Sequence, residues 1–509
     1  MMIKVILLVI FFAVMVAVGI YSRKHAMSVD GFVLGGRSVG PWLTAFAYGT
    51  SYFSAVVFVG YAGQFGWKYG LASTWIGIGN AVIGSLMAWV VLGRRTKVMT
   101  QYLNSKTMPD FFGSRYGSKP LKIAASAIVF VFLVPYTASI YNGLSRLFEM
   151  AFHIPYAWCV IGMAVFTGIY VILGGYMATA INDFIQGIIM LAGIIVVIAA
   201  VLNGQGGFLE AVGRMAEIPS DVEITLGQPG AFTSFFGPDP GNLLGVVILT
   251  SLGTWGLPQM IGKFYAIKDE KSINTGTVIS TVFAIVVSGG CYFLGGFARL
   301  FDAPAIYDEA GAVVYDSIIP HMLSALPDIL IGIVVVLVLS ASMSTLASLV
   351  LTSSSTLTLD FLKDNLLKEM GEKRQVRTMQ VLVIFFIAVS VFIALDPPTF
   401  IAQLMGISWG ALAGAFLAPF LYGLYWKGTT RAGVWASFIV GVGITVVNMF
   451  MPFIESSINA GAAAMVAGLI VVPVVSLITP KLSREKTDAI FSCYEEKVTI
   501  TKKRSLEQN

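Results

Sequence analysis

The chain has 509 residues, of which 57% are hydrophobic and only 12% are charged, whereas soluble domains carry about 25% charged residues. A soluble protein of this composition would have too little polar surface to face water, so the sequence predicts an all-α polytopic membrane protein. The formal net charge of +5 comes from 32 basic and 27 acidic residues, and their distribution along the chain decides whether nucleic acid is a partner.

Thirteen stretches are apolar enough to form membrane-spanning helices, which need roughly 20 residues each. In chain order they are residues 2–21, 41–66, 71–92, 123–151, 156–176, 181–203, 241–263, 273–300, 326–353, 379–396, 398–425, 433–452 and 460–479. The breaks at residues 153–155 and 396–398 depend on proline turns. Basic residues rather than a cleavage site follow the first stretch, which favours a retained first helix.

Lys and Arg concentrate in every second connecting segment. With the N-terminus outside, the inner segments hold 27 of the 32 basic residues; these segments are 22–40, 93–122, 263–272, 354–378, 426–432 and 480–509. The opposite loops are acidic. The positive-inside rule therefore places the N-terminus outside and the C-terminus in the cytoplasm of a plasma-membrane protein. The basic excess is a topology signal, and no nucleic-acid partner is expected.

Two of the predicted spans are unlike simple lipid-facing helices. Span 41–66 carries Gly49 among hydroxyls at its centre, and span 241–263 carries Gly253, Gly256 and Pro258. Pro258 cannot donate to its helix, and carbonyls freed at mid-membrane are tolerated only where they face protein, water or a ligand. We therefore predict helix breaks at these residues. The two spans lie five apart, as two inverted five-helix repeats would place them. Close helix packing through the same glycines is the alternative.

The segment LSASMSTLAS, residues 339–348, places hydroxyls inside an apolar span. Ala341, Ser344, Thr345 and Ser348 share one face of a helix, at i, i+3, i+4 and i+7. Neutral oxygens suit a hard cation such as Na+, and two hydroxyls with carbonyls from a broken helix could replace its hydration shell. The same hydroxyls could instead join helices by hydrogen bonds, and this stretch alone leaves both roles open.

Several motifs in chain order resemble the sodium:solute symporter family over roughly residues 5–480. They include FVLGGRSVGPWLTAFAYGTSYFSA, TMPDFFGSRYG, INDFIQGIIMLAG, GLPQMIGKFYAIKDEKS, SASMSTLAS and GLYWKGTTRAGVWASFIVG. The resemblance implies a LeuT-like inverted repeat over spans 2–6 and 7–11, flanked by spans 1, 12 and 13. It also implies a secondary active symporter rather than an enzyme. Such a symporter couples Na+ to the import of a small organic solute and needs no cofactor besides this ion.

The resemblance assigns the sodium site residue by residue. The site is expected to consist of the main-chain carbonyls of Thr50, Phe53 and Ala341 and the hydroxyls of Ser344 and Thr345. Asp183, in INDFIQG, matches a family aspartate near the inner end of its helix, where sodium leaves. An acidic residue near an apolar span is a functional candidate by default, and a helix N-cap is the alternative role of Asp183.

The solute is less closely defined than the ion. Tyr136 matches a tyrosine near the substrate of the proline carriers, whereas Tyr52 replaces an aspartate and Thr250 an aromatic residue of those carriers. The candidate solute-binding residues are Ser51, Tyr52, Ser54, Tyr136, Thr250, Thr254 and Trp255. An amino acid such as proline is the first candidate solute. Pantothenate or a monocarboxylate is the alternative, held by helix N-termini and hydroxyls because no Arg or Lys lies mid-membrane in spans 2 and 7. Proton coupling is the rival for the ion.

Other classes of membrane protein fit the sequence less well. A channel would need equivalent pore helices or rings of like charge, and a sensor would need an appended signalling domain. An enzyme would need a titratable pair inside the bilayer, where only Asp183 is evident. We expect one transmembrane transporter domain over residues 1–480 and a polar cytoplasmic tail over residues 481–509. The expected partners are Na+, a small organic solute and the lipid bilayer, and the chain is expected to be a monomer.

Overall fold

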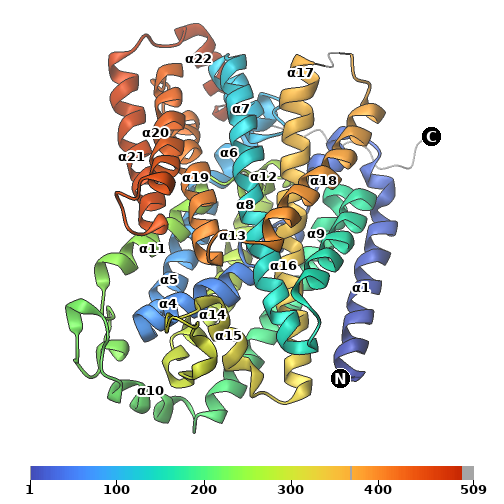
Figure 1. Cartoon of the computed structure of the whole chain (residues 1–509). Helices are drawn as coiled ribbons and strands as arrows, with labels where there is room; N and C mark the ends of the chain where they lie inside the picture. The colour runs from blue at the N-terminus through green and yellow to red at the C-terminus, as the bar shows by residue number, and fades with distance from the viewer. Residues whose placement is uncertain (1, 367–368, 496–509) are drawn as a thin grey trace.

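The computed structural model describes residues 2–366 and 369–495, and these residues form a bundle of helices without a β-strand (Figure 1). Eleven described helical segments are long and apolar enough to cross a membrane. Two of them, Val56–Tyr102 and Tyr156–Gly204, have 47 and 49 residues, more than twice the length that one crossing needs. Each contains a glycine with positive φ, Gly70 at 58° and Gly175 at 53°. Divided there, the described chain makes the thirteen passes that the sequence predicts.

The helices that cross the bundle are connected at its two ends, in several places by short helices. The crossing helices and half-helices are α1 (Met2–Ser22), α3 (Pro41–Tyr52), α4 (Ala62–Tyr69), α5 (Thr74–Gly79), α6 (Arg94–Tyr102), α8 (Lys119–Phe152), α9 (Tyr156–Gly204), α11 (Pro240–Leu252), α12 (Pro258–Ala266), α13 (Glu270–Ala284), α14 (Gly290–Gly295), α16 (Asp328–Thr356), α18 (Glu372–Leu395), α19 (Ile401–Tyr425), α20 (Arg431–Phe450) and α21 (Ser457–Ile478). Short helices include α2 (Val29–Leu34), α7 (Met108–Tyr116), α10 (Phe208–Glu217), α15 (Tyr315–Ser324) and α22 (Arg484–Phe491).

The start of the first helix and the last described α-helix lie at opposite ends of the bundle. In Figure 1 the start of α1 lies at the same end as α10 and α15, whereas α7 and α22 lie at the other end. This placement agrees with an odd number of passes. Of the predicted polar tail, residues 496–509 lie outside the described residues. The part that is described includes α22, where Asp488 forms an ion pair of 2.7 Å with Lys427.

Two passes are broken inside the bundle. The first break follows α3 at Phe53, which has an extended backbone (φ −100°, ψ 126°) before a π-helical turn over Val56–Tyr61. The second break lies between α11 and α12. There a 3-10 turn over Gly253–Trp255 is followed by an extended Leu257, and Pro258 begins α12. Proline is favoured at the first position of a helix because its missing N–H would have no partner there. The break predicted around Pro258 is confirmed.

Gly49 lies inside α3 rather than at its break, which corrects the expectation for this residue. The helix continues to Tyr52. A Cβ at position 49 would lie 2.4 Å from the Phe283 ring, so glycine allows α13 to pack closely on α3. The chain leaves the helix just beyond Tyr52, where a neighbouring helix supplies a partner for a freed backbone group: the Ala55 N–H donates to the Ser342 hydroxyl at 3.1 Å.

Helix α16 lies at the centre of the bundle and carries the LSASMSTLAS segment. It packs against α3, α8, α9 and α18. Every residue from 337 to 351 is buried, although the composition of this stretch would suit a lipid-facing helix. The hydroxyls on this stretch of α16 therefore face protein, and those of Ser344, Thr345 and Ser348 find partners within the bundle.

Asp316 joins α15 to the start of α19. Its Oδ2 accepts a hydrogen bond of 3.2 Å from the Ile401 N–H, and its side chain is buried. Burial raises the pKa of this carboxyl to about 6, although the Ile401 hydrogen bond and the Arg146 charge act to lower it. The folded state thus holds a proton more tightly than the unfolded state does. The contribution of Asp316 to stability is therefore greatest below the unfolded pKa of 3.8 and is lost as the pH rises through about 6.

We expect Asp316→Asn to stabilise the protein at pH 7.5. The amide keeps an acceptor for the Ile401 N–H but carries no charge to desolvate, and a pKa shift of roughly two units corresponds to about 2–3 kcal/mol. Thermal unfolding of the purified protein in detergent measures the difference between variant and wild type. The gain should shrink as the pH is lowered toward 4, and a gain that is equal at every pH would contradict this account of Asp316.

Candidate functional site

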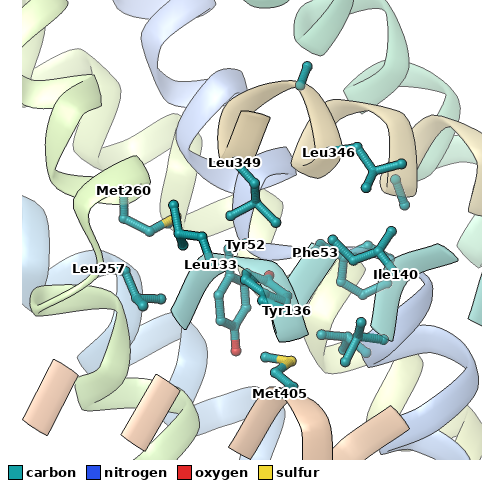
Figure 2. Close-up of a cluster of buried hydrophobic side chains, with 14 of the residues drawn as sticks. Tyr52, Phe53, Leu133, Tyr136, Ile140, Leu257, Met260, Leu346, Leu349 and Met405 are labelled. Atoms are coloured by element: carbon teal, nitrogen blue, oxygen red, sulfur yellow. The ribbon is translucent and has the colours of Figure 1, made fainter. Parts of the chain in front are cut away.

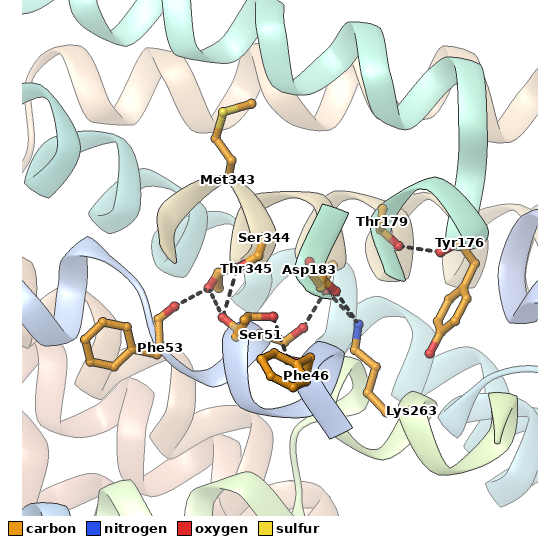
Figure 3. Close-up of polar contacts among 12 residues, drawn as sticks. Phe46, Ser51, Phe53, Tyr176, Thr179, Asp183, Lys263, Met343, Ser344 and Thr345 are labelled. Carbon is orange, nitrogen blue, oxygen red and sulfur yellow. Dashed lines mark hydrogen bonds and ion pairs between the residues drawn. The ribbon is translucent and has the colours of Figure 1, made fainter. Parts of the chain in front are cut away.

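Five oxygens from α3 and α16 gather at the first helix break (Figure 3). The Thr345 hydroxyl lies 3.1 Å from the Thr50 carbonyl and 3.0 Å from the Phe53 carbonyl. It also lies 3.1 Å from the Ala341 carbonyl of its own helix. The Ser344 hydroxyl lies 3.0 Å from the Thr50 carbonyl and 2.9 Å from the Ala341 carbonyl. All five residues are buried, so the structure brings together the whole set predicted for the sodium site.

The ends of the helices explain why these oxygens are available. Thr50 lies in the last turn of α3, where carbonyls lack partners within the helix, and Phe53 lies just beyond it. Ser344 and Thr345 follow Ala341 by three and four residues, so both hydroxyls reach back to its carbonyl. A hydroxyl has two acceptor lone pairs besides its one donor. The five neutral oxygens can therefore turn their lone pairs toward a small hard cation.

A buried ion pair lies one helical turn from this oxygen cluster (Figure 3). The Lys263 Nζ lies 3.7 Å from the Asp183 Oδ2 and donates a hydrogen bond of 3.0 Å to the Ser348 hydroxyl. The Ser348 hydroxyl in turn lies 2.8 Å from the Ser51 hydroxyl. Asp183 is fully buried and Lys263 is 3% exposed. A chain of polar contacts thus runs from the carboxylate to the residue after Thr50.

Two sequence expectations about this pair need correction. Asp183 lies well inside α9, so the N-cap role is wrong. The sequence predicts Lys263 in an inner loop and Asp183 as the one titratable group within the bilayer. The structure instead buries Lys263 in α12, where it pairs with Asp183. One feature of the sequence could have indicated a buried lysine. Lys263 is the single charged residue in the apolar helix PQMIGKFYA, five residues after the proline that begins it.

Tyr52, Tyr136 and Trp409 form an aromatic cluster beside the first break, and Figure 2 shows the two tyrosines with Leu133 and Met405 around them. The ring centroids of both tyrosines lie 5.8 Å from that of Trp409. The two phenol hydroxyls and the indole Nε1 are buried and make no hydrogen bond of ordinary geometry within the described residues. An unsatisfied buried donor costs about 1–3 kcal/mol. Three such donors in one cluster suit a polar ligand.

The remaining candidate solute residues lie around this cluster and already have partners. The Thr250 hydroxyl donates to the Val246 carbonyl at 2.9 Å, one turn back in α11. The Trp255 indole donates to the Ile83 carbonyl at 2.9 Å. Ser54 accepts a hydrogen bond of 3.2 Å from the Val56 N–H at the break. Their roles in solute binding stay predictions.

A small cavity, with room for about one water molecule, adjoins Tyr52 between α3, α13 and the second break. Its polar lining residues are Asn80, Ser85, Thr254, Ser280 and Ser288. The Thr254 hydroxyl is within hydrogen-bond distance of the Gly84 carbonyl at 3.0 Å and of the Ser251 carbonyl at 2.9 Å. The two helix breaks therefore share one small polar region in the middle of the bundle.

The fold and these sites define a multi-pass membrane transporter in which two broken helices meet at a buried polar site.

The family model of the sodium:solute symporter family matches residues 32–441, and the chain belongs to this family. Sodium/proline symporters of Staphylococcus aureus strains JH9 and NCTC 8325 / PS 47 are 30% identical to it over 500 residues, which are 94% of this chain and 93% of each relative.

A solved structure supports the fold. It is the substrate-bound outward-open state of a Na+-coupled sialic acid symporter, and it matches with a TM-score of 0.76 at 14% identity. The match covers 94% of this chain and 99% of that one. The LeuT-like, all-α fold class expected from the sequence is thereby confirmed. The transporter family is consistent with a protein that is not an enzyme.

Proposed function

We propose that the chain is a sodium-coupled symporter of the plasma membrane that imports a small organic solute, an amino acid such as proline. The oxygen cluster of Thr50, Phe53, Ala341, Ser344 and Thr345 is the observation that carries this proposal. Its ligands are neutral and hard, which suits an alkali cation. The cluster contains no titratable side chain, so it offers a proton no acceptor of its own and favours sodium over proton coupling.

Sodium bound here would link ion binding to the shape of the solute site. Its ligands come from two elements, the end of α3 and the middle of α16, so the ion stabilises conformations in which these elements touch. Tyr52 lies in the last turn of α3 and belongs to the aromatic cluster. Holding α3 against α16 therefore holds Tyr52 in place for the solute. By linkage, bound solute strengthens sodium binding by the same factor.

The aromatic cluster fits a small zwitterion with an apolar body. A solute carboxylate would accept hydrogen bonds from the Tyr52, Tyr136 and Trp409 donors, which make no hydrogen bond of ordinary geometry within the described residues. The aromatic faces would pack against an aliphatic ring and attract an ammonium group. The sodium/proline symporters that are 30% identical to this chain support the same solute class. Pantothenate and monocarboxylates lack the ammonium group and are the second candidates.

The charge distribution supports a cytoplasmic C-terminus. The end of the bundle that carries α7 and α22 is the end to which the basic segments belong, and the start of α1 lies at the opposite end (Figure 1). In this orientation Asp183 lies between the oxygen cluster and the cytoplasm, on the route by which sodium would leave.

We expect an inside-negative membrane potential to accelerate uptake of the solute. One sodium ion carried with a zwitterion moves one positive charge inward, and a potential of 100 mV contributes about 2.3 kcal/mol per charge. The potential alone could then support a nearly fiftyfold accumulation. Uptake by proteoliposomes with and without a potassium diffusion potential measures this effect over a panel of proline, other amino acids, pantothenate and short carboxylates. A monocarboxylate carried with one sodium ion would instead be indifferent to potential.

A further inference from the structure

Lys263 places an ammonium group among oxygens that could themselves hold a cation. The group donates to the Ser348 hydroxyl at 3.0 Å and lies 3.7 Å from the Asp183 carboxylate. The Ser51 hydroxyl lies 2.8 Å beyond Ser348. These four residues come from α3, α9, α12 and α16, so they meet only in the folded bundle (Figure 3). A carboxylate and two hydroxyls form a hard donor set of the kind that suits an alkali cation.

The Asp183 carboxylate depends on Lys263 for its compensating charge. Neither of its oxygens has a hydrogen-bond partner in the described part of the chain, and the residue is fully buried. Lys263 is the only basic residue among the described ones that forms an ion pair with it. A buried charge that loses its partner is strongly destabilised, so a vacancy at the ammonium position would attract another cation.

Ser348 and Ser51 connect this ammonium to the five-oxygen cluster. Ser348 follows Ser344 by one helical turn on the same face of α16, and Ser51 follows Thr50 in α3. On its other side Lys263 lines a cavity shared with Lys106 and Thr107, which lie at the α7 end of the bundle. The ammonium therefore lies between the cluster and this cavity.

We propose that Lys263 is a tethered cation whose ammonium group occupies a second cation site formed by Asp183, Ser348 and Ser51. The transporter then binds one sodium ion in each cycle, because the second position is filled by a charge that never leaves the protein. The proposal rests on the proposed sodium coupling at the neighbouring cluster. It also assigns a reason for a lysine at this point in the apolar helix α12.

The decisive variant is Lys263→Met, which keeps an unbranched side chain and removes the charge. Equilibrium binding of radioactive sodium to the purified protein, with choline replacing sodium at constant ionic strength, is expected to count one ion in the wild type and two in the variant. The Hill coefficient for sodium-dependent uptake should rise in parallel from about 1 to about 2. Lys263→Arg, which keeps the charge, should bind one ion, and so should the double variant Asp183→Asn/Lys263→Met, which removes the carboxylate as well.

Two further readouts separate this role from that of a structural brace. Sodium should raise the melting temperature of Lys263→Met more steeply than that of the wild type. Loss of a structural brace would instead lower the melting temperature of the variant equally at every sodium concentration. In case the variant does not fold, the wild type still tests the proposal, because it should move one charge per zwitterion. Two ions bound by the wild type, or one ion bound by Lys263→Met, would overturn it. A wild type that binds no sodium would instead refute the proposed function.

Discussion

We expect Thr345→Ala to raise the sodium concentration for half-maximal uptake by about tenfold or more. The Thr345 hydroxyl lies within 3.1 Å of three carbonyls, two of them at the broken end of α3, so it is the most central ligand of the oxygen cluster. A hydrogen bond or ligand contact to a charged species contributes about 1.5–3 kcal/mol, and about 1.4 kcal/mol corresponds to a factor of ten. Ser344→Ala should act in the same direction.

Two control variants make this result specific. Thr345→Ser keeps the hydroxyl and should stay near the wild type in its sodium dependence. Ser354→Ala removes a buried hydroxyl from the same helix, but that hydroxyl donates to the Leu351 carbonyl at 3.2 Å, away from the cluster. Its sodium dependence should be unchanged. If both Thr345→Ala and Ser344→Ala keep the wild-type sodium dependence, the cluster is not the sodium site.

The second large effect concerns the solute. Tyr136→Phe and Trp409→Phe each remove a buried donor that makes no hydrogen bond of ordinary geometry within the described protein. If these donors bind the solute carboxylate, each loss should raise the KM for solute by about tenfold to a hundredfold at saturating sodium. The matched control is Tyr141→Phe, because Tyr141 is another buried tyrosine of α8 whose hydroxyl makes no hydrogen bond of ordinary geometry within the described residues, and it lies outside the aromatic cluster. An unchanged KM in both cluster variants would remove these residues from the solute site.

The sodium cluster could be predicted because its determinants are local. Helical spacing places Ala341, Ser344 and Thr345 on one face whatever the rest of the fold does. The carbonyls of Thr50 and Phe53 could not be predicted in this way. Every residue has a main-chain oxygen, so the residue type does not show which oxygens are ligands. Only the family resemblance predicts these two carbonyls, and the extended backbone at Phe53 is the physical reason that they are available.

Lys263 and Trp409 could not be placed from the sequence because their environment is made by distant segments. Lys263 lies next to a basic loop in the chain, and only its contacts with Asp183 of α9 and Ser348 of α16 show that it belongs to the buried interior. Trp409 lies in an apolar span where an aromatic residue is ordinary. Its importance appears only when Tyr52 and Tyr136, from two other helices, lie against it.

At Gly49 the local sequence predicts a helix break, but the packing of a neighbouring helix determines the structure. A glycine among hydroxyls in a membrane span is typical of a helix break, but it serves equally where another helix must come close. Phe283 of α13 takes up that space, and α3 stays helical for three more residues. At Gly253 and Gly256 the local rule succeeded because Pro258 removes a backbone donor there as well.

Solute accumulation in proteoliposomes under imposed ion gradients tests sodium coupling most directly. With the membrane potential held at zero, an inward sodium gradient should drive proline uptake above equilibrium, and Thr345→Ala should need a higher sodium concentration for the same rate. An inward proton gradient with choline in place of sodium should drive none. Uptake driven by the proton gradient in the complete absence of sodium would contradict the account.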